Sequence, residues 1–161
     1  MELKELFLEK LQELASAEQL LVNNLPDLIT ASFHSELRLA FSTHLRQTEN
    51  QTHRIDLAFA SLGQKTCTRP CKPMGALIAE ASQIAVRRAA GTVRDIAVLD
   101  IALRIEHSEI AAYLSLIALA DSLGYTTASS LLTENLNEEQ HTAKRLQEIG
   151  DTLLETVPAT T

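Results

Sequence analysis

The chain has 161 residues, of which 45% are apolar and 22% are charged, and its formal net charge at pH 7 is −7. This length and apolar content predict a single domain, residues 1–161, that can bury a substantial core. The excess of acidic residues argues against binding to nucleic acid or to anionic membranes, because both need a basic surface.

The first predicted helix runs from about Leu3 to Ala31, with leucines at helical spacing on one face. Pro26 lies inside it and predicts a kink or a break near the last turn. Acidic residues near the N-terminus argue against a cleaved signal peptide. No apolar run approaches the roughly 20 residues that a bilayer span needs. We therefore expect a cytoplasmic protein.

The second predicted helix runs from about Ser35 to Leu62 and stops before Gly63, a residue type that often follows a helix end. A polar segment with Cys67 and Cys71 follows. Two cysteines without further Cys or His nearby cannot complete a tetrahedral zinc site, and their spacing is not Cys-x-x-Cys. The pattern favours two loop thiols and leaves a redox pair open.

A shorter helix is predicted from about Met74 to Ala90, and two long helices follow at about Val93–Leu123 and Thr126–Leu154. No stretch shows the alternation of a strand. Short loops join the first two and the last two long helices, whereas the middle connection is long and carries the short helix. This order predicts an all-α fold, a ferritin-like four-helix bundle with one long crossover that carries a fifth short helix.

Charged residues also fall on the apolar faces of the four long helices. Burying an ionised carboxylate is costly unless it is neutralised, paired or bound to metal. Counting from the helix ends places all of these residues near mid-bundle, as a shared site requires. A carboxylate-rich set with one imidazole suits iron or manganese, and we expect one or two ions per chain. The candidate ligands are Glu18, His44, Glu106, Glu109 and Glu139, with Glu109 on the flank as a bridging or supporting group.

Three further polar residues on these faces, Thr48, Gln51 and Tyr113, are expected to orient the ligands through hydrogen bonds. In well-known di-iron bundles, Glu and His are expected where Thr48 and Gln51 stand here. A full set of six di-iron ligands is therefore not predicted.

Two pairs resemble metal motifs by spacing alone. Glu138 and His141 form Glu-x-x-His, the pattern of carboxylate-bridged di-iron bundles. Glu49 and His53 form Glu-x-x-x-His. Both histidines lie roughly opposite the apolar stripes of their helices, so we expect them to be solvated.

Five segments carry a family resemblance, and they span about Leu6 to Ile149: SAEQLLVNNLP, THLRQTENQTHRI, CKPMGALIAEA, RIEHSEIAAYLSLIALADSLGY and LLTENLNEEQ. They resemble the YciE/YciF family, bacterial stress-associated proteins of the ferritin-like superfamily. The most specific piece is Glu-His-x-Glu-Ile-Ala-x-Tyr at 106–113. The resemblance implies a four-helix bundle with a fifth short helix, a homodimer and a stress-response role. His53 and Ala143 stand where the family generally or often has an acid, which predicts weaker metal binding.

Two hypotheses remain open. In the first, the protein is a dimeric ferritin-like metalloprotein whose iron or manganese site reacts with dioxygen or peroxide. In the second, it is a metal-free dimeric interaction protein with no cofactor, and its inward polar residues form a hydrogen-bonded network that fixes helix register. The sequence does not decide whether the protein is an enzyme.

Overall fold

The computed structural model describes residues 2–158. Helices account for most of this range, and no strand forms within it. The helices are α1 (Leu3–Ala31), α2 (Ser35–Ser61), α3 (Lys72–Arg87), α4 (Thr92–Ser122) and α5 (Thr126–Glu155). The helix ends predicted from the sequence agree with these bounds to within three residues. The largest differences are in α3, which starts before Met74 because Pro73 occupies its first turn, where proline costs no hydrogen bond.

The helix α1 is continuous through Pro26, so the predicted break does not occur. Pro26 lies on the exposed face of the helix. A proline removes the hydrogen bond to the carbonyl four residues earlier, here that of Val22, and water can hydrate such a group near a surface. The burial of Leu25 and Leu28 on the opposite face holds the last turns in place.

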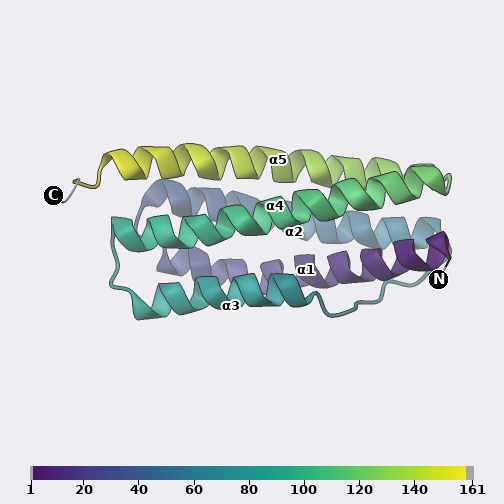
Figure 1. The fold of residues 1–161 in the computed structure, drawn as a ribbon, viewed down its shortest axis with the longest axis horizontal. Coiled ribbons are helices and arrows are strands. Elements are labelled where there is room, and N and C mark those ends of the chain that lie inside the picture. Colours follow the sequence, from purple (N-terminus) through teal and green to yellow (C-terminus); the bar gives the residue numbers. More distant parts are fainter. Residues whose placement is uncertain (1, 159–161) are drawn as a thin grey trace.

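The four long helices form a bundle with one long crossover (Figure 1). Helices α1 and α2 form one antiparallel pair, α4 and α5 form another, and α2 packs against α5. The connection after α2 returns along the length of the bundle, so α2 and α4 run in the same direction. The short helix α3 packs on α1 and α4. This arrangement confirms the predicted ferritin-like four-helix bundle with a fifth short helix in its crossover.

The bundle holds two apolar cores, one in each half of its length. The first core, in the half that α3 covers, includes Leu25, Leu28, Leu37, Phe41, Met74, Ile101 and Leu146. The second core, in the other half, includes Phe7, Leu11, Ile55, Phe59, Leu116 and Leu132. Between the two cores lies a layer of buried polar side chains, hereafter the polar layer: Glu18, His44, Thr48, Gln51, Glu106, Glu109, Asn135, Glu139 and Thr142.

A separate buried carboxylate, Asp95, ties the first turn of α4 to the turn between α1 and α2. Its side chain accepts hydrogen bonds from the backbone N–H groups of Phe33 at 3.0 Å and His34 at 2.7 Å. The Nδ1 atom of His34 lies 2.9 Å from the same carboxylate. Asp95 is 1% exposed. These contacts satisfy a carboxylate that would otherwise be costly to bury, and they fix one end of the bundle.

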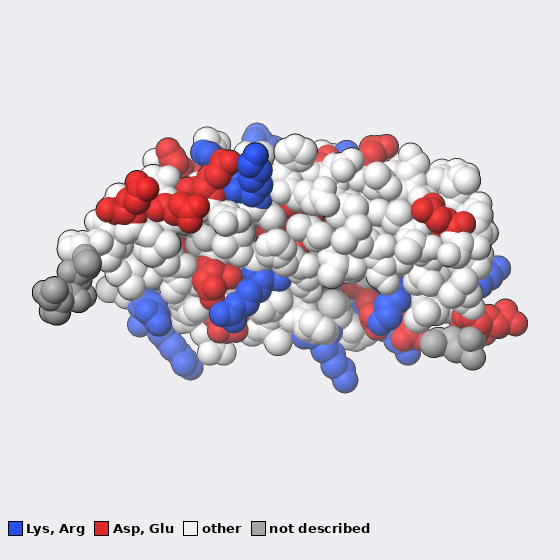
Figure 2. All heavy atoms as spheres, turned by 45° about the horizontal axis from the view of Figure 1, so that its top comes forward, with Lys and Arg blue, Asp and Glu red and all other residues white. Residues whose placement is uncertain are grey.

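The outer surface is mixed in charge. On the face in Figure 2, acidic and basic side chains form small separate groups among broad uncharged areas. Within residues 2–158, every helix is too short or too polar to cross a membrane.

Candidate metal centre

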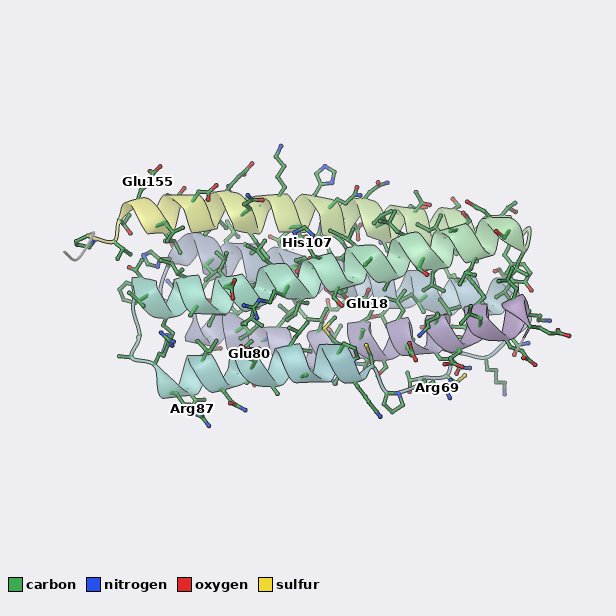
Figure 3. The ribbon with its side chains drawn as sticks, viewed as in Figure 1. Glu18, Arg69, Glu80, Arg87, His107 and Glu155 are labelled. Carbon is green, nitrogen blue, oxygen red and sulfur yellow. The ribbon has the colours of Figure 1, made fainter. Side chains whose placement is uncertain are left out.

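The polar layer forms because each long helix passes from one core to the other at the same level. On α1, Glu18 follows Leu14 of the second core and precedes Leu21 of the first core. The labelled side chain of Glu18 lies near the middle of the bundle's long axis in Figure 3. The corresponding polar positions on the other helices are His44 on α2, Glu106 and Glu109 on α4, and Glu139 on α5. Helical periodicity therefore sends all of these side chains inward at one depth.

Four of these side chains converge tightly. His44, Glu106, Glu109 and Glu139 each offer one ligand atom, and these four atoms lie within 4.8 Å of one another. The Nε2 atom of His44 is 3.2 Å from Oε1 of Glu106. All four residues are at most 2% exposed. Three helices thus supply three carboxyl groups and one imidazole to a single buried point.

Burial and mutual repulsion shape the charge state of this point. Burial raises the pKa of the Glu106 carboxyl well above its ordinary range, and the neighbouring Glu139 raises it further. Burial likewise raises the pKa of Glu109, with added repulsion from Glu18 and Glu139. Burial lowers the pKa of His44, which favours the neutral imidazole that binds metals. Without a cation, the carboxyl groups can be buried together only if several hold protons.

The residues present fit a metal ion. Within the described chain, no hydrogen-bond partner reaches either carboxyl oxygen of Glu109 or of Glu139, or Oε2 of Glu106. Buried polar atoms are nearly always satisfied in folded proteins, so such a group needs an explanation. Oxygen-rich ligands with one imidazole suit iron or manganese, and a bound cation would lower the repulsion among the carboxylates.

Glu18 lies just outside the compact group of four, although it was predicted as a ligand with them. The hydroxyl of Tyr113 donates a hydrogen bond to its Oε1 atom. Its Oε2 atom has no partner among residues 2–158. Burial raises the pKa of Glu18 well above its ordinary range, and Glu139 adds to the rise. One oxygen of Glu18 is therefore held in place, and the other is free to meet a cation.

The other residues expected to orient ligands bond elsewhere. Thr48 donates its hydroxyl hydrogen bond to the backbone carbonyl of His44, at 2.9 Å, one turn earlier in its own helix. Gln51 donates from Nε2 to Oε2 of Glu138, at 3.0 Å. Thus only Tyr113 of the three donates to a predicted ligand's side chain within the described residues.

A partly buried hydrogen-bonded network beside the site includes Asn135, Arg54 and Glu138, which were not among the predicted site residues. The amide of Asn135 donates to the Tyr113 hydroxyl at 3.0 Å, and its Oδ1 atom accepts from Arg54 at 3.0 Å. Arg54 also binds both carboxylate oxygens of Glu138, each at 3.0 Å. Helical spacing could have placed Asn135 on the buried face, since it lies three residues after Leu132 and four before Glu139.

The two pairs that resemble metal motifs by spacing alone lie outside the compact group of four. His53 and His141 are both exposed, as predicted from their helical positions. Glu49 is exposed, whereas Glu138 is part of the Arg54 network. Cys67 and Cys71 are both free thiols; Cys67 is exposed and Cys71 is half-buried.

Comparison with known proteins agrees with the fold. The sequence matches the family described as "Domain of unknown function (DUF892)" over residues 2–157. It is 36% identical to protein YciF of Escherichia coli K12 over 149 residues, which cover 92% of this chain and 90% of YciF.

Solved structures of similar proteins share the fold of this chain. The crystal structure of the E. coli stress protein YciF superposes with a TM-score of 0.93 at 34% identity, covering 97% of this chain and 99% of that one. YcfI from Rhodopseudomonas palustris has a TM-score of 0.89 at 36% identity, covering 91% and 94%. A Xanthomonas campestris protein at 19% identity shares the fold, with a TM-score of 0.77 and coverage of 95% and 94%. The family match along nearly the whole described chain, together with these relatives, shows that the chain belongs to the DUF892 family, which includes YciF.

Proposed function

We propose that the protein binds one or two iron or manganese ions in the polar layer, and that this site reduces dioxygen or peroxide. The observation that supports the proposal is the convergence of His44, Glu106, Glu109 and Glu139, whose ligand atoms lie within 4.8 Å of one another while fully buried. Glu18 would add a further carboxylate through Oε2. A cation would replace the protons that the crowded carboxyl groups otherwise hold.

Two ferrous ions held by these residues would supply two electrons and become ferric. With two protons, these electrons would reduce dioxygen to hydrogen peroxide, or hydrogen peroxide to two water molecules. The residues would hold the ions, exclude bulk water and provide protons near the reacting molecule. Tyr113 would keep Glu18 in one orientation, because its hydroxyl is itself fixed by Asn135. The apolar cores on both sides of the polar layer would keep the site dry.

The relatives give the proposal a physiological setting. YciF of E. coli is described as a stress protein. A protein that consumes hydrogen peroxide and ferrous iron together would protect a stressed cell, because these two reactants otherwise produce hydroxyl radicals. We propose this protective role for the present chain.

Metal analysis tests the proposal. Wild-type protein without a tag is expressed with iron and manganese supplements, and metal is measured by ICP-MS before and after anaerobic Fe(II) addition. We expect one or two equivalents per chain in the wild type and a loss of metal in Glu106→Gln and Glu139→Gln. Glu49→Gln, an exposed glutamate on α2, serves as the matched control. Wild-type protein that takes up no stoichiometric metal under either condition would refute the proposal.

A metal-free dimeric interaction protein is the second candidate. The network of Arg54, Glu138, Gln51, Asn135 and Tyr113 favours it, because such bonds can fix helix register without a metal. It leaves the carboxyl oxygens of Glu109 and Glu139 without partners in the described chain, which the metal hypothesis explains. Light scattering with size-exclusion chromatography tests for the dimer, and thermal melts with and without chelator test for a metal. This candidate predicts a dimer whose melting temperature is the same with and without chelator.

A further inference from the structure

A pocket of about 320 Å³ opens on the side of the bundle where α3 begins, between α1 and α4. It exists because α3 covers only the half of the bundle that holds the first core, with its buried Met74, Ile78 and Ala81. The crossover segment before α3 runs along α1 instead, where the N–H of Arg69 donates to the carbonyl of Gln12 at 3.1 Å. The pocket therefore lies at the level where the two cores meet, which is the level of the polar layer.

Glu109 belongs both to this pocket and to the candidate metal centre. It lines the pocket, it is 1% exposed, and its ligand atom is one of the four within 4.8 Å. Both of its carboxyl oxygens lack a hydrogen-bond partner among residues 2–158. An unpartnered buried carboxyl group in the wall of a pocket marks a point where an incoming molecule can reach the centre.

The chemistry of the residues that line the pocket determines which kind of molecule can enter it. They are mainly apolar and include Leu14, Met74, Ala112 and Leu116. The charged lining residues Lys10 and Glu13 lie 2.8 Å apart as an ion pair, so they neutralise each other. A hydrated dication would lose water against such walls at a high free-energy cost. A small uncharged molecule would not, and cavities of about 150 Å³ already hold molecules as large as benzene.

We propose that this pocket is the access route by which a small uncharged oxidant with an O–O bond, dioxygen or hydrogen peroxide, reaches the Glu109 side of the metal centre. The inference rests on the proposed function, since it assigns the path of the co-substrate to that same site. It adds a residue-level assignment: Ala112 and Ser108 on α4 border the path, and Cys71 stands in its wall.

A blocked pocket tests the route. Ala112→Phe places a ring at a half-buried position in the pocket. Ala40→Phe is the matched control, because Ala40 is also half-buried on a helix and lines a different hollow, of about 260 Å³, beside His141. Ser108→Leu, a smaller change in the same wall, replaces Ala112→Phe if that variant does not fold.

Two measurements are made on the wild type and the variants. Crystals of metal-free protein are pressurised with xenon, an uncharged probe that reports on the pocket without any metal. Separately, protein loaded anaerobically with Fe(II), with its iron content measured, is mixed in a stopped-flow instrument with dioxygen or with hydrogen peroxide. The two oxidants form separate arms, and the arm that the blocking variant slows identifies the molecule that uses the route.

We expect xenon in this pocket in the wild type and in Ala40→Phe but not in Ala112→Phe. We also expect Ala112→Phe to slow iron oxidation roughly tenfold, the effect of about 1.4 kcal/mol of added barrier, with iron content unchanged. Equal oxidation rates in iron-loaded Ala112→Phe and wild type, with both oxidants, would overturn the route, as would a wild-type pocket that holds no xenon. A wild type that binds no iron overturns the proposed function and the route together, and the iron measurement identifies that case.

Discussion

Tyr113 on α4 donates a hydrogen bond from its hydroxyl to the carboxyl group of Glu18 on α1, and this bond joins the second core to the polar layer. The ring of Tyr113 is fully buried in that core. The hydroxyl also accepts a hydrogen bond from Asn135 on α5. Three helices are therefore connected through one oxygen atom, and the orientation of Glu18 depends on it.

Replacing Tyr113 with Phe removes this oxygen and keeps the ring. We expect the free energy of unfolding to fall by about 1–3 kcal/mol, because Glu18 loses its donor in a buried setting. Urea denaturation of the metal-free protein measures the change. Tyr125→Phe is the control, since the half-buried Tyr125 contributes its ring to an edge-to-face contact with Phe7 at 5.5 Å. Equal losses in both variants would show that the hydroxyl bond to Glu18 contributes nothing.

Metal-free protein should lose stability as pH rises above the ordinary carboxyl range. Burial raises the pKa of Glu18, Glu106 and Glu109 well above the ordinary value of 4.5. The folded state therefore keeps protons that the unfolded chain releases, and its advantage is complete below about pH 4.5 and is lost as pH rises through the raised pKa values. Burial lowers the pKa of His44 from its ordinary 6.5, so this group acts in the opposite sense below pH 6.5.

As pH rises above 6.5, the imidazole becomes mainly neutral in both states, and the three carboxyl groups dominate the dependence on pH. Urea denaturation with chelator at several pH values between 6.5 and 8 should show a falling free energy of unfolding. Glu109→Gln should make this decline shallower, because it removes one titrating group, whereas Glu49→Gln should leave it unchanged. A rising free energy over this range in the wild type would contradict the prediction.

Metal binding should oppose this decline of stability with pH, and metal removal should restore it. A cation binds the deprotonated carboxylates, so the stabilisation it gives should grow with pH. With free metal at 100 times its dissociation constant, the expected gain is about 2.7 kcal/mol. Thermal melts with Mn(II) or with chelator, at pH 5.5 and pH 7.5, measure the effect. Glu139→Gln should show no such gain, and an equal gain in that variant would place the binding site elsewhere.

Asp95 should stabilise the end of the bundle that lies opposite the second core. Asp95→Ala leaves the N–H groups of Phe33 and His34 without their acceptor, and we expect a loss of about 1–3 kcal/mol in the free energy of unfolding. Chemical denaturation measures it, and hydrogen exchange should show faster exchange at these two amides. Asp100→Ala is the control, because Asp100 forms only an exposed pair with Arg104. Similar losses in both variants would mean that the buried contacts of Asp95 add no stability.

The sequence by itself determined the helices and the side chains that face inward. Apolar residues at intervals of three and four define one face of each long helix, and this pattern is local. It therefore located Glu18, His44, Glu106, Glu109 and Glu139 on buried faces, and it correctly left His53 and His141 in solvent. Depth could also be estimated by counting from short loops, because adjacent helices in a hairpin share one end.

Only the tertiary structure decided which of these residues meet. The distance between side chains on different helices depends on the axial shift and rotation of each helix, and both cores set these through contacts distant in sequence. That packing brings Glu109 into the compact group and leaves Glu18 beside it on Tyr113. The same holds for Asp95, whose partners lie 61 and 62 residues away. The pocket at Glu109 exists because α3 covers one half of the bundle, and only the packing of its face on α1 and α4 determines where that cover begins.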